Sequence, residues 1–420
     1  MSNNFGENKS GRHYDDGTSR QDDDEPKVKI EVEHLRMKKS ISSIHCTAIL
    51  VAVTGHVSVF VSPVAILRNA GSVGLSILIW LTGGIMNLCV CLVFTELGII
   101  YQHAGGIYTY IYNVFGPLPG FLMLWGYLIL IVGPFWAFIA YTGAIYITMP
   151  AFPSGCNFPE NAAKILAAWI LLTFVAVNCV YMKYVTKVQT ILSGSKLIGL
   201  TIVIVAGIIV IIKGGTENFE NVFENTPTDA GKISMAVFFS IFSYGGWQIV
   251  SGLMEEVKRP EKDVPKAVYL SFSIVIILYI ATNIAYFSVL SPSEIMQSDA
   301  VAITFMQKLY PAVTPVISVL VGISAIGVLN ASIMGHSRLL FAGARNKQAP
   351  LILGMLHSEY LTPWPAIFVV TVWSLVMLFS GGLTTMMEFI QVFSCLQNIV
   401  CTSALLTLRW KQPHLSKSYK

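Results

Sequence analysis

Long apolar blocks separated by short polar connections dominate this sequence. Each block holds about 18 residues or more, the length at which a helix crosses about 30 Å of hydrocarbon. The pattern therefore predicts an all-α membrane protein with about ten transmembrane helices. The predicted spans lie near residues 43–66, 73–100, 118–148, 164–182, 190–213, 233–254, 267–290, 314–337, 363–381 and 385–408.

The composition agrees with a membrane protein. Of the 420 residues, 54% are hydrophobic and 12% are charged, whereas soluble domains carry about 25% charge. A net charge of +4 is too small to indicate nucleic-acid binding. The polar start of the chain lacks the apolar core of a signal peptide. We therefore predict a disordered cytosolic tail at 1–42, a transmembrane domain at 43–412 and a cytosolic tail at 413–420.

The placement of basic residues predicts the orientation. With a cytosolic N-terminus, most Lys and Arg residues between spans fall on the cytosolic side, as the positive-inside rule requires. The even span count then places both termini in the cytosol. The inside residues are Lys27, Lys29, Arg36, Lys38, Lys39, Lys183, Lys187, Lys258, Arg259, Lys262, Lys266, Arg345, Lys347, Arg409, Lys411, Lys417 and Lys420, against Arg68, Lys164, Lys213, Lys232 and Lys308 outside.

Ten spans divide into two groups of five with opposite orientations, because five is odd. This arithmetic predicts a five-plus-five inverted repeat, in which spans one and six break near the midplane to form a site. Span one carries Thr54, Gly55 and His56 at its middle, and span six carries Gly245 and Gly246. The alternative is that these glycines permit close helix packing. The glycine pair favours a break, while Gly55 alone fits both interpretations.

Several short motifs follow one another in order over residues 43–412. They are Phe60-Val61-Ser62-Pro63, Ala70-Gly71-Ser72, Glu96-Leu97-Gly98, Gly105-Gly106-Ile107-Tyr108, Val188-Gln189, Phe242-Ser243-Tyr244-Gly245-Gly246-Trp247, Glu255-Glu256, Arg259-Pro260, Val264-Pro265-Lys266-Ala267 and Ser337-Arg338-Leu339. The ordered set resembles the L-type amino acid transporter light chains of heteromeric amino acid transporters, within the amino acid–polyamine–organocation superfamily. The resemblance implies the leucine-transporter-like fold with helices 1 and 6 broken. Members have twelve helices, whereas ten are predicted here.

Cysteine usage points to a partner. Six cysteines fall within predicted spans, and Cys156 alone lies in an outside loop. An unpaired cysteine in an oxidising compartment indicates an intermolecular bridge, with a free thiol as the alternative. The resemblance implies that Cys156 is linked to a single-span glycoprotein heavy chain.

A zwitterionic amino acid needs partners for a carboxylate and an ammonium. Two broken helices offer free N–H groups and free carbonyls, without any charged side chain. The expected substrate-binding residues are Thr54, Gly55, His56, Val57, Ser58, Phe242, Ser243, Gly245 and Gly246.

Two residues of the first break depart from the family. The resemblance implies that a Gly-Ser-Gly-Ile-Phe segment holds the carboxylate, and the matching stretch here is His56 to Phe60. His56 and Ser58 thus replace glycines that allow close backbone approach. His56 either donates a hydrogen bond to the carboxylate or blocks the pocket.

The resemblance assigns roles to two further side chains. It implies that Phe242 is an aromatic gate, with an apolar residue facing lipid as the alternative. Lys196 lies inside the fifth span, where a lysine is costly unless it faces the protein or snorkels to the interface. The resemblance implies that Lys196 occupies the place of a sodium ion, which fits a sodium-independent mechanism.

Other residues leave alternatives open. Phe135 and Trp136 of the third span either narrow the pocket or face lipid. Glu96, Glu255 and Arg338 lie near the cytosolic ends of predicted spans. They either form ion pairs that gate the site or are solvated side chains.

We expect a sodium-independent transporter or exchanger of neutral L-amino acids at the plasma membrane, working by alternating access. The alternative is a non-transporting relative that senses amino acids or serves as a partner of the heavy chain. The His and Ser replacements favour that alternative, and the preserved span-six motif opposes it. No metal-ligand spacing, nucleophile motif or phosphate loop indicates an enzyme or a cofactor.

Overall fold

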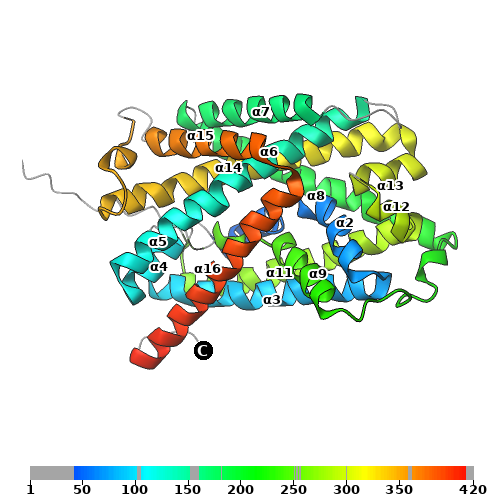
Figure 1. The fold of residues 1–420 in the computed structure, drawn as a ribbon, viewed down its shortest axis with the longest axis horizontal. Helices are drawn as coiled ribbons and strands as arrows, with labels where there is room; N and C mark the ends of the chain where they lie inside the picture. Colours follow the sequence, from blue (N-terminus) through cyan, green and yellow to red (C-terminus); the bar gives the residue numbers. More distant parts are fainter. Residues whose placement is uncertain are drawn as a thin grey trace, which may run out of the picture. The chain divides into compact units, whose positions relative to one another are not determined.

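The computed structural model describes residues 42–101, 106–151, 160–180, 182–249, 251, 254, 257–298, 300–357 and 362–412. All of them belong to one compact unit, Met37–Lys420. Both predicted tails lie almost entirely outside the described residues. The described part is a bundle of helices, and Figure 1 shows their order along the chain.

The first half of the predicted repeat holds five spans. Span one consists of α1 (Ser43–Val53) and α2 (Ser58–Ala70), which are bent by 53° at the residues between them. Span two is α3 (Val73–Ile100), and α4 (Gly106–Phe115) connects it to the next. Span three runs through α5 (Pro117–Tyr127), the π-helical segment η1 (Leu128–Val132) and α6 (Gly133–Thr148), and continues into the 3-10 turn η2 (Met149–Ala151). Spans four and five are α7 (Glu160–Val180) and α8 (Met182–Ile212).

The second half follows the 3-10 turn η3 (Glu217–Phe219). Span six begins with α9 (Ala230–Ser243), which ends early and is followed by the 3-10 turn η4 (Trp247–Ile249). Span seven is α11 (Pro260–Val289), and two short helices, α12 (Pro292–Met296) and α13 (Val301–Leu309), with η5 (Pro311–Val313), lead to span eight, α14 (Thr314–Arg345). The turn η6 (Leu351–Gly354) precedes α15 (Trp364–Ser380) and α16 (Leu383–Lys411), spans nine and ten.

Ten predicted spans correspond to these elements. Among the described residues, seven helices are long and apolar enough to cross a membrane, and the bent pair α1–α2 makes eight. The other two, α9 and α15, are apolar but shorter. In α9 the cause is the break after Ser243, which interrupts an otherwise longer apolar stretch.

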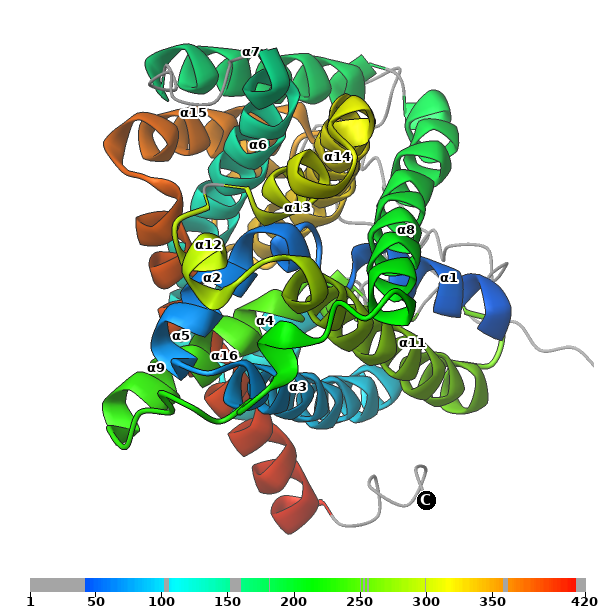
Figure 2. The ribbon, with the colours of Figure 1, turned by 90° about the vertical axis from the view of Figure 1, so that its right-hand side faces the viewer.

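In four of the five pairs of counterpart spans, the two helices pack against each other. Span one contacts span six through α2 and α9, span two contacts span seven through α3 and α11, and span three contacts span eight through α6 and α14. Figures 1 and 2 show α7 and α15, spans four and nine, side by side. Such pairing is expected when the halves are related by a pseudo-two-fold axis.

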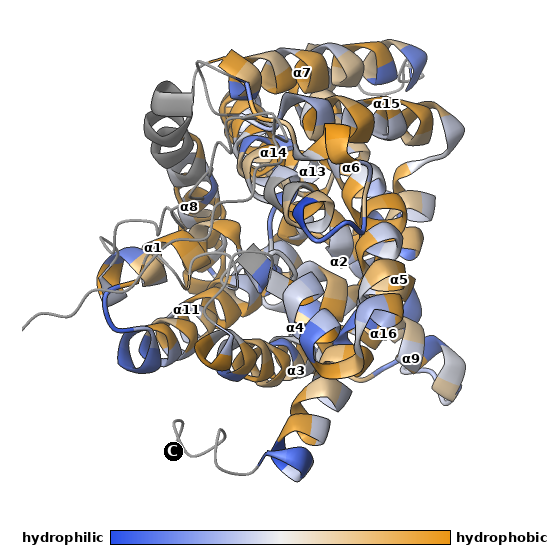
Figure 3. Cartoon of the chain, turned by 90° about the vertical axis from the view of Figure 1, so that its left-hand side faces the viewer, coloured by the Kyte–Doolittle hydropathy of each residue, from blue (hydrophilic) through white to orange (hydrophobic). Residues whose placement is uncertain are grey.

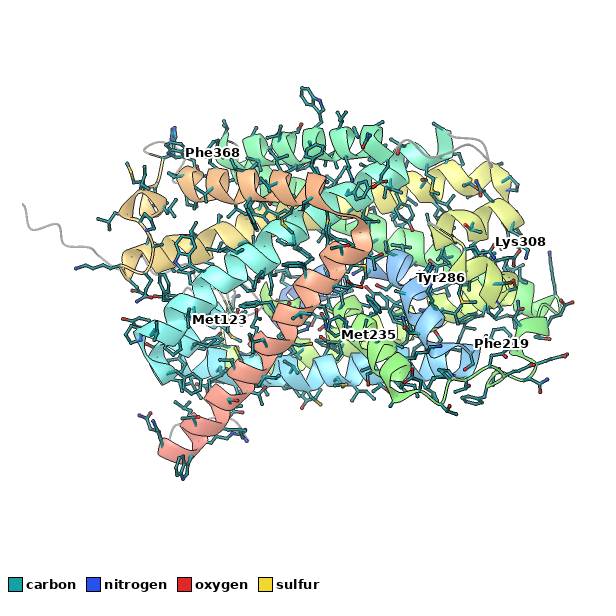
Figure 4. All side chains as sticks on the ribbon, viewed as in Figure 1. Met123, Phe219, Met235, Tyr286, Lys308 and Phe368 are labelled. Atoms are coloured by element: carbon teal, nitrogen blue, oxygen red, sulfur yellow. The ribbon has the colours of Figure 1, made fainter. Side chains whose placement is uncertain are left out.

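The outer surface of the bundle is apolar. Figure 3 colours much of α7, α15 and α14 as hydrophobic. Trp169 on α7 is 67% exposed, and Phe368 on α15, labelled in Figure 4, is 62% exposed. Apolar side chains this exposed along long helices are typical of contact with lipid.

Candidate functional site

The first break comprises the four residues Thr54 to Val57, between α1 and α2. Gly55 has a φ of +71° and His56 has a φ of +24°. A Cβ at Gly55 would lie 1.9 Å from the hydroxyl oxygen of Tyr279, which donates to the Gly55 carbonyl over 2.7 Å. Glycine is therefore required at position 55 by both conformation and space, which favours the break over simple helix packing.

The second break follows Ser243, where α9 ends. Gly246 has a φ of +97°, and a Cβ there would lie 2.4 Å from the Val53 carbonyl oxygen at the end of α1. The backbone of span six thus lies directly on the backbone of span one. Figure 2 shows the divided first span, with α1 beside α8 and α11, and α2 near α12.

Hydrogen bonds join the two breaks. The Gly55 N–H donates to the Gly245 carbonyl over 2.6 Å, and the Ser58 hydroxyl donates to the Ser243 carbonyl over 2.7 Å. The Phe242 carbonyl accepts the Gly245 N–H over 3.0 Å. The carbonyls expected to meet a substrate ammonium are therefore paired with protein donors in this state, and a substrate would have to replace those bonds.

The His56 ring fills the space between the breaks. The side chain is 2% exposed. Its Nε2–Cδ2 edge faces the glycine pair, since a Cβ at Gly245 would lie 3.4 Å from Nε2 and one at Gly246 3.6 Å from Cδ2. The ring centroid is 5.2 Å from that of Phe135 and 5.1 Å from that of Phe242. Buried Nδ1 has no hydrogen-bond partner in the described structure.

Aromatic side chains of spans three and six enclose this ring. Phe242 is 3% exposed, with its centroid 5.5 Å from that of Phe138. Phe135 is buried, and buried Trp136 donates through Nε1 to Nδ1 of His336 over 3.2 Å. All of these rings face the protein, which excludes the lipid-facing alternative for Phe135, Trp136 and Phe242.

Lys196 faces the end of α1. Its Nζ donates to the Thr54 carbonyl over 2.6 Å and to the Val51 carbonyl over 3.2 Å, and the residue is 2% exposed. The carbonyls at the end of a helix carry partial negative charge and lack helical partners. The ammonium satisfies them, so Lys196 does not snorkel.

Three polar residues near the breaks were missed by the sequence analysis. Tyr279 binds the Gly55 carbonyl, as described above. Asn87 on α3 accepts from Trp247 Nε1 over 2.9 Å and donates to the Ile241 carbonyl over 3.1 Å, which holds both sides of the second break. The third is His336. A lone Asn or His inside an apolar span is costly, and this cost is the signal that would have identified both.

The remaining predicted residues lie away from the breaks or outside the described structure. Glu96, 4% exposed, pairs with Arg409 of α16, with 2.5 Å between Oε2 and Nη2. It is thus an ion pair between spans two and ten rather than a solvated side chain. Glu255, the Arg338 side chain and Cys156 lie outside the described residues. Within the described part, six cysteines are free and no group of three or more His, Cys, Asp or Glu residues could hold a metal ion.

Comparison with known proteins identifies the family. The sequence pattern of the amino acid permease family matches residues 43–420. Large neutral amino acids transporter small subunit 2 of Mus musculus is 36% identical over 387 residues, covering 91% of this chain and 73% of that protein. The cystine/glutamate transporter of Homo sapiens is 33% identical over 388 residues, covering 92% of this chain and 77% of that protein.

A third relative is also an amino acid transporter, and a solved structure has a similar fold. Asc-type amino acid transporter 1 of Mus musculus is 33% identical over 393 residues, covering 92% of this chain and 74% of that protein. The inward-facing conformation of Mhp1 superposes with a TM-score of 0.60 and 12% identity, covering 91% of this chain and 80% of that one. The structural match confirms the predicted leucine-transporter-like fold, and the relatives do not favour a non-transporting protein. This chain belongs to the amino acid permease family and is a multi-pass transmembrane amino acid transporter.

Proposed function

We propose that this protein is a sodium-independent exchanger of neutral L-amino acids that works by alternating access. The observation that carries the proposal is the contact of two helix breaks, joined from Gly55 to Gly245 and held by Lys196. Unwound backbone at the midplane is the means by which transporters of this architecture bind substrate and coupling ions.

Sodium independence is supported by the contacts of Lys196. Its ammonium already donates hydrogen bonds to the Thr54 and Val51 carbonyl oxygens. Backbone oxygens of this kind are the ligands that a sodium ion would otherwise bind. A second cation beside this ammonium would be repelled. A coupled sodium ion is therefore not needed to hold the end of α1.

The side chains around the breaks support the proposal that the substrates are neutral. The described residues that contact the two breaks directly include His56, Ser58, Phe242, Tyr279 and Lys196, and of these five Lys196 carries a full charge. A zwitterion can bind through its own ammonium and carboxylate to backbone groups. A cationic substrate side chain would be repelled by Lys196, and an anionic one would have to compete for an ammonium that already donates to the Thr54 and Val51 carbonyls.

We further propose the plasma membrane as the location, with both termini cytosolic, and a glycoprotein heavy chain linked through Cys156 as the partner. The identity to small subunit 2 of a large neutral amino acids transporter supports this assembly.

The test is uptake by cells that express the full chain with a heavy chain. Labelled neutral amino acids are supplied in sodium or in choline buffer, with and without unlabelled amino acid inside. Equal saturable uptake in both buffers, stimulated by internal amino acid, is the expected result. Uptake that needs sodium, or no uptake from a chain shown to be at the surface, would contradict the proposal.

A further inference from the structure

The imidazole of His56 occupies the volume between the two breaks. Three surfaces enclose it: Phe135 of span three, Phe242 of span six and the backbone of Gly245 and Gly246. The ring is buried, so little of its surface is left for a ligand or for water. A substrate bound here has to share this volume with a side chain.

The walls around the ring leave few ways to enlarge the volume. Phe138 packs against Phe242, and His336 packs against Phe135 with a centroid distance of 6.2 Å. Phe138 is fully buried, and His336 accepts a hydrogen bond from Trp136. Packed interiors resist added methylenes, so a bulky substrate side chain would have to displace several rings at once.

One edge of the ring has unused hydrogen-bonding capacity. Nδ1 is buried without a partner among the described residues, on the opposite edge from the glycine pair. A buried polar atom without a partner is rare and unfavourable. A polar ligand group beside Nδ1 would satisfy it.

We infer that His56 is a specificity-determining residue that restricts the substrates to small neutral amino acids, such as glycine, alanine and serine, and that its Nδ1 contacts a polar group of the bound substrate. The inference rests on the proposed function and names its substrate class. The side chain then has two roles: the volume of the ring limits the size of the substrate, and Nδ1 contributes to the affinity for it.

Two substitutions separate these roles. His56→Gly removes the ring and also the strain of a side chain at positive φ. His56→Leu keeps a similar side-chain volume and removes the ring nitrogens. Full-length wild type and both variants are co-expressed with a heavy chain. Uptake of labelled glycine, alanine, leucine and phenylalanine is measured per transporter at the surface. Size-exclusion profiles of the fluorescently tagged chains show that each variant is folded.

The wild type is expected to prefer alanine over leucine by about tenfold or more, since pocket volume discriminates on this scale. His56→Gly should reduce that preference to less than about threefold. His56→Leu should keep the preference, with a half-saturating alanine concentration about tenfold higher, because one hydrogen bond is lost.

Other outcomes would overturn the inference in distinguishable ways. Equal wild-type uptake of leucine and alanine would refute the size limit while leaving the exchanger intact. A silent wild type with an active His56→Gly variant would make the ring a block rather than a selector, and would also contradict the proposed function of the native chain. An unchanged alanine affinity in His56→Leu would refute the role of Nδ1. If neither wild type nor His56→Gly transported any of the four, the proposed function itself would fail, and the inference with it.

Discussion

The Ser58 hydroxyl donates to the Ser243 carbonyl over 2.7 Å, joining two broken spans across 185 positions of sequence. The same oxygen lies 2.9 Å from the carbonyl oxygen of Gly55 in the first break. A hydroxyl has one proton, so the shorter contact identifies Ser243 as the main acceptor. The resemblance implies a glycine at this position, and a glycine has no hydroxyl to make this bond between the two breaks.

We predict that Ser58→Ala lowers the melting temperature of the purified protein. The Ser243 carbonyl would be left buried and unpaired, at a cost of about 1 kcal/mol. Ser62→Ala is the matched control, because the Ser62 hydroxyl on the same helix is buried without a partner. A fall in melting temperature as large for Ser62→Ala as for Ser58→Ala would show that the Ser58–Ser243 bond is not the cause.

Gly55→Ala should destabilise the protein more strongly than Ser58→Ala. The new methyl would overlap the Tyr279 hydroxyl, and the φ of +71° is unfavourable for alanine, a conformational cost of about 1 kcal/mol or more before the overlap is counted. Gly194→Ala on α8 is the control, because a Cβ there meets no atom within 4 Å. The fraction of protein that stays monodisperse after heating is measured by size-exclusion chromatography. It should be lower than wild type for Gly55→Ala and equal to wild type for Gly194→Ala.

Lys196→Met is expected to reduce amino acid uptake by about tenfold to a hundredfold, the effect of losing hydrogen bonds from a charged donor. The Thr54 and Val51 carbonyls at the end of α1 would lose their cationic partner. Lys213→Met, at an exposed position directly after α8, controls for the loss of a positive charge.

The same variant tests whether the ammonium stands in for sodium. If it does, residual uptake by Lys196→Met should be higher in sodium than in choline, while wild-type uptake should be equal in both. Normal uptake by Lys196→Met would show that the contact is dispensable.

Acid should weaken one ion pair outside the predicted spans. Lys308, labelled in Figure 4, lies 2.7 Å from Glu294 Oε1, and this hydrogen-bonded ammonium lowers the pKa of Glu294 below its ordinary value of 4.5. A lowered folded-state pKa contributes stability above the unfolded value. That contribution is lost as the pH falls through the folded value.

Glu294→Gln isolates the charge, because glutamine can still accept the Ser291 N–H that closes the helix cap. Melting temperatures of wild type and variant, measured from about pH 7 to about pH 3, should differ at neutral pH and converge in acid. Both residues are partly exposed, so the difference should be small and should shrink in high salt. A difference that grows in acid, or that appears equally in Glu224→Gln, would contradict the assignment.

The sequence by itself determined the class of protein, the multi-pass architecture and the places where the first and sixth apolar segments are interrupted. Apolar block length decides which segments cross a membrane, and glycine beside small polar residues marks where a helix is interrupted. The pair Gly245 and Gly246 was identified in this way, Gly55 alone fitted both a break and close packing, and the ordered motifs indicated the family.

Only the tertiary structure decided which way the side chains of those spans face. A transmembrane helix is apolar on the side that meets lipid and on the side that meets its neighbours, so hydropathy does not distinguish them. Phe135 and Phe242 were therefore ambiguous until spans one, three and six were packed around His56. The Ser58–Ser243 bond joins atoms far apart in the chain, and it exists because the pairing of the two halves brings the breaks into contact.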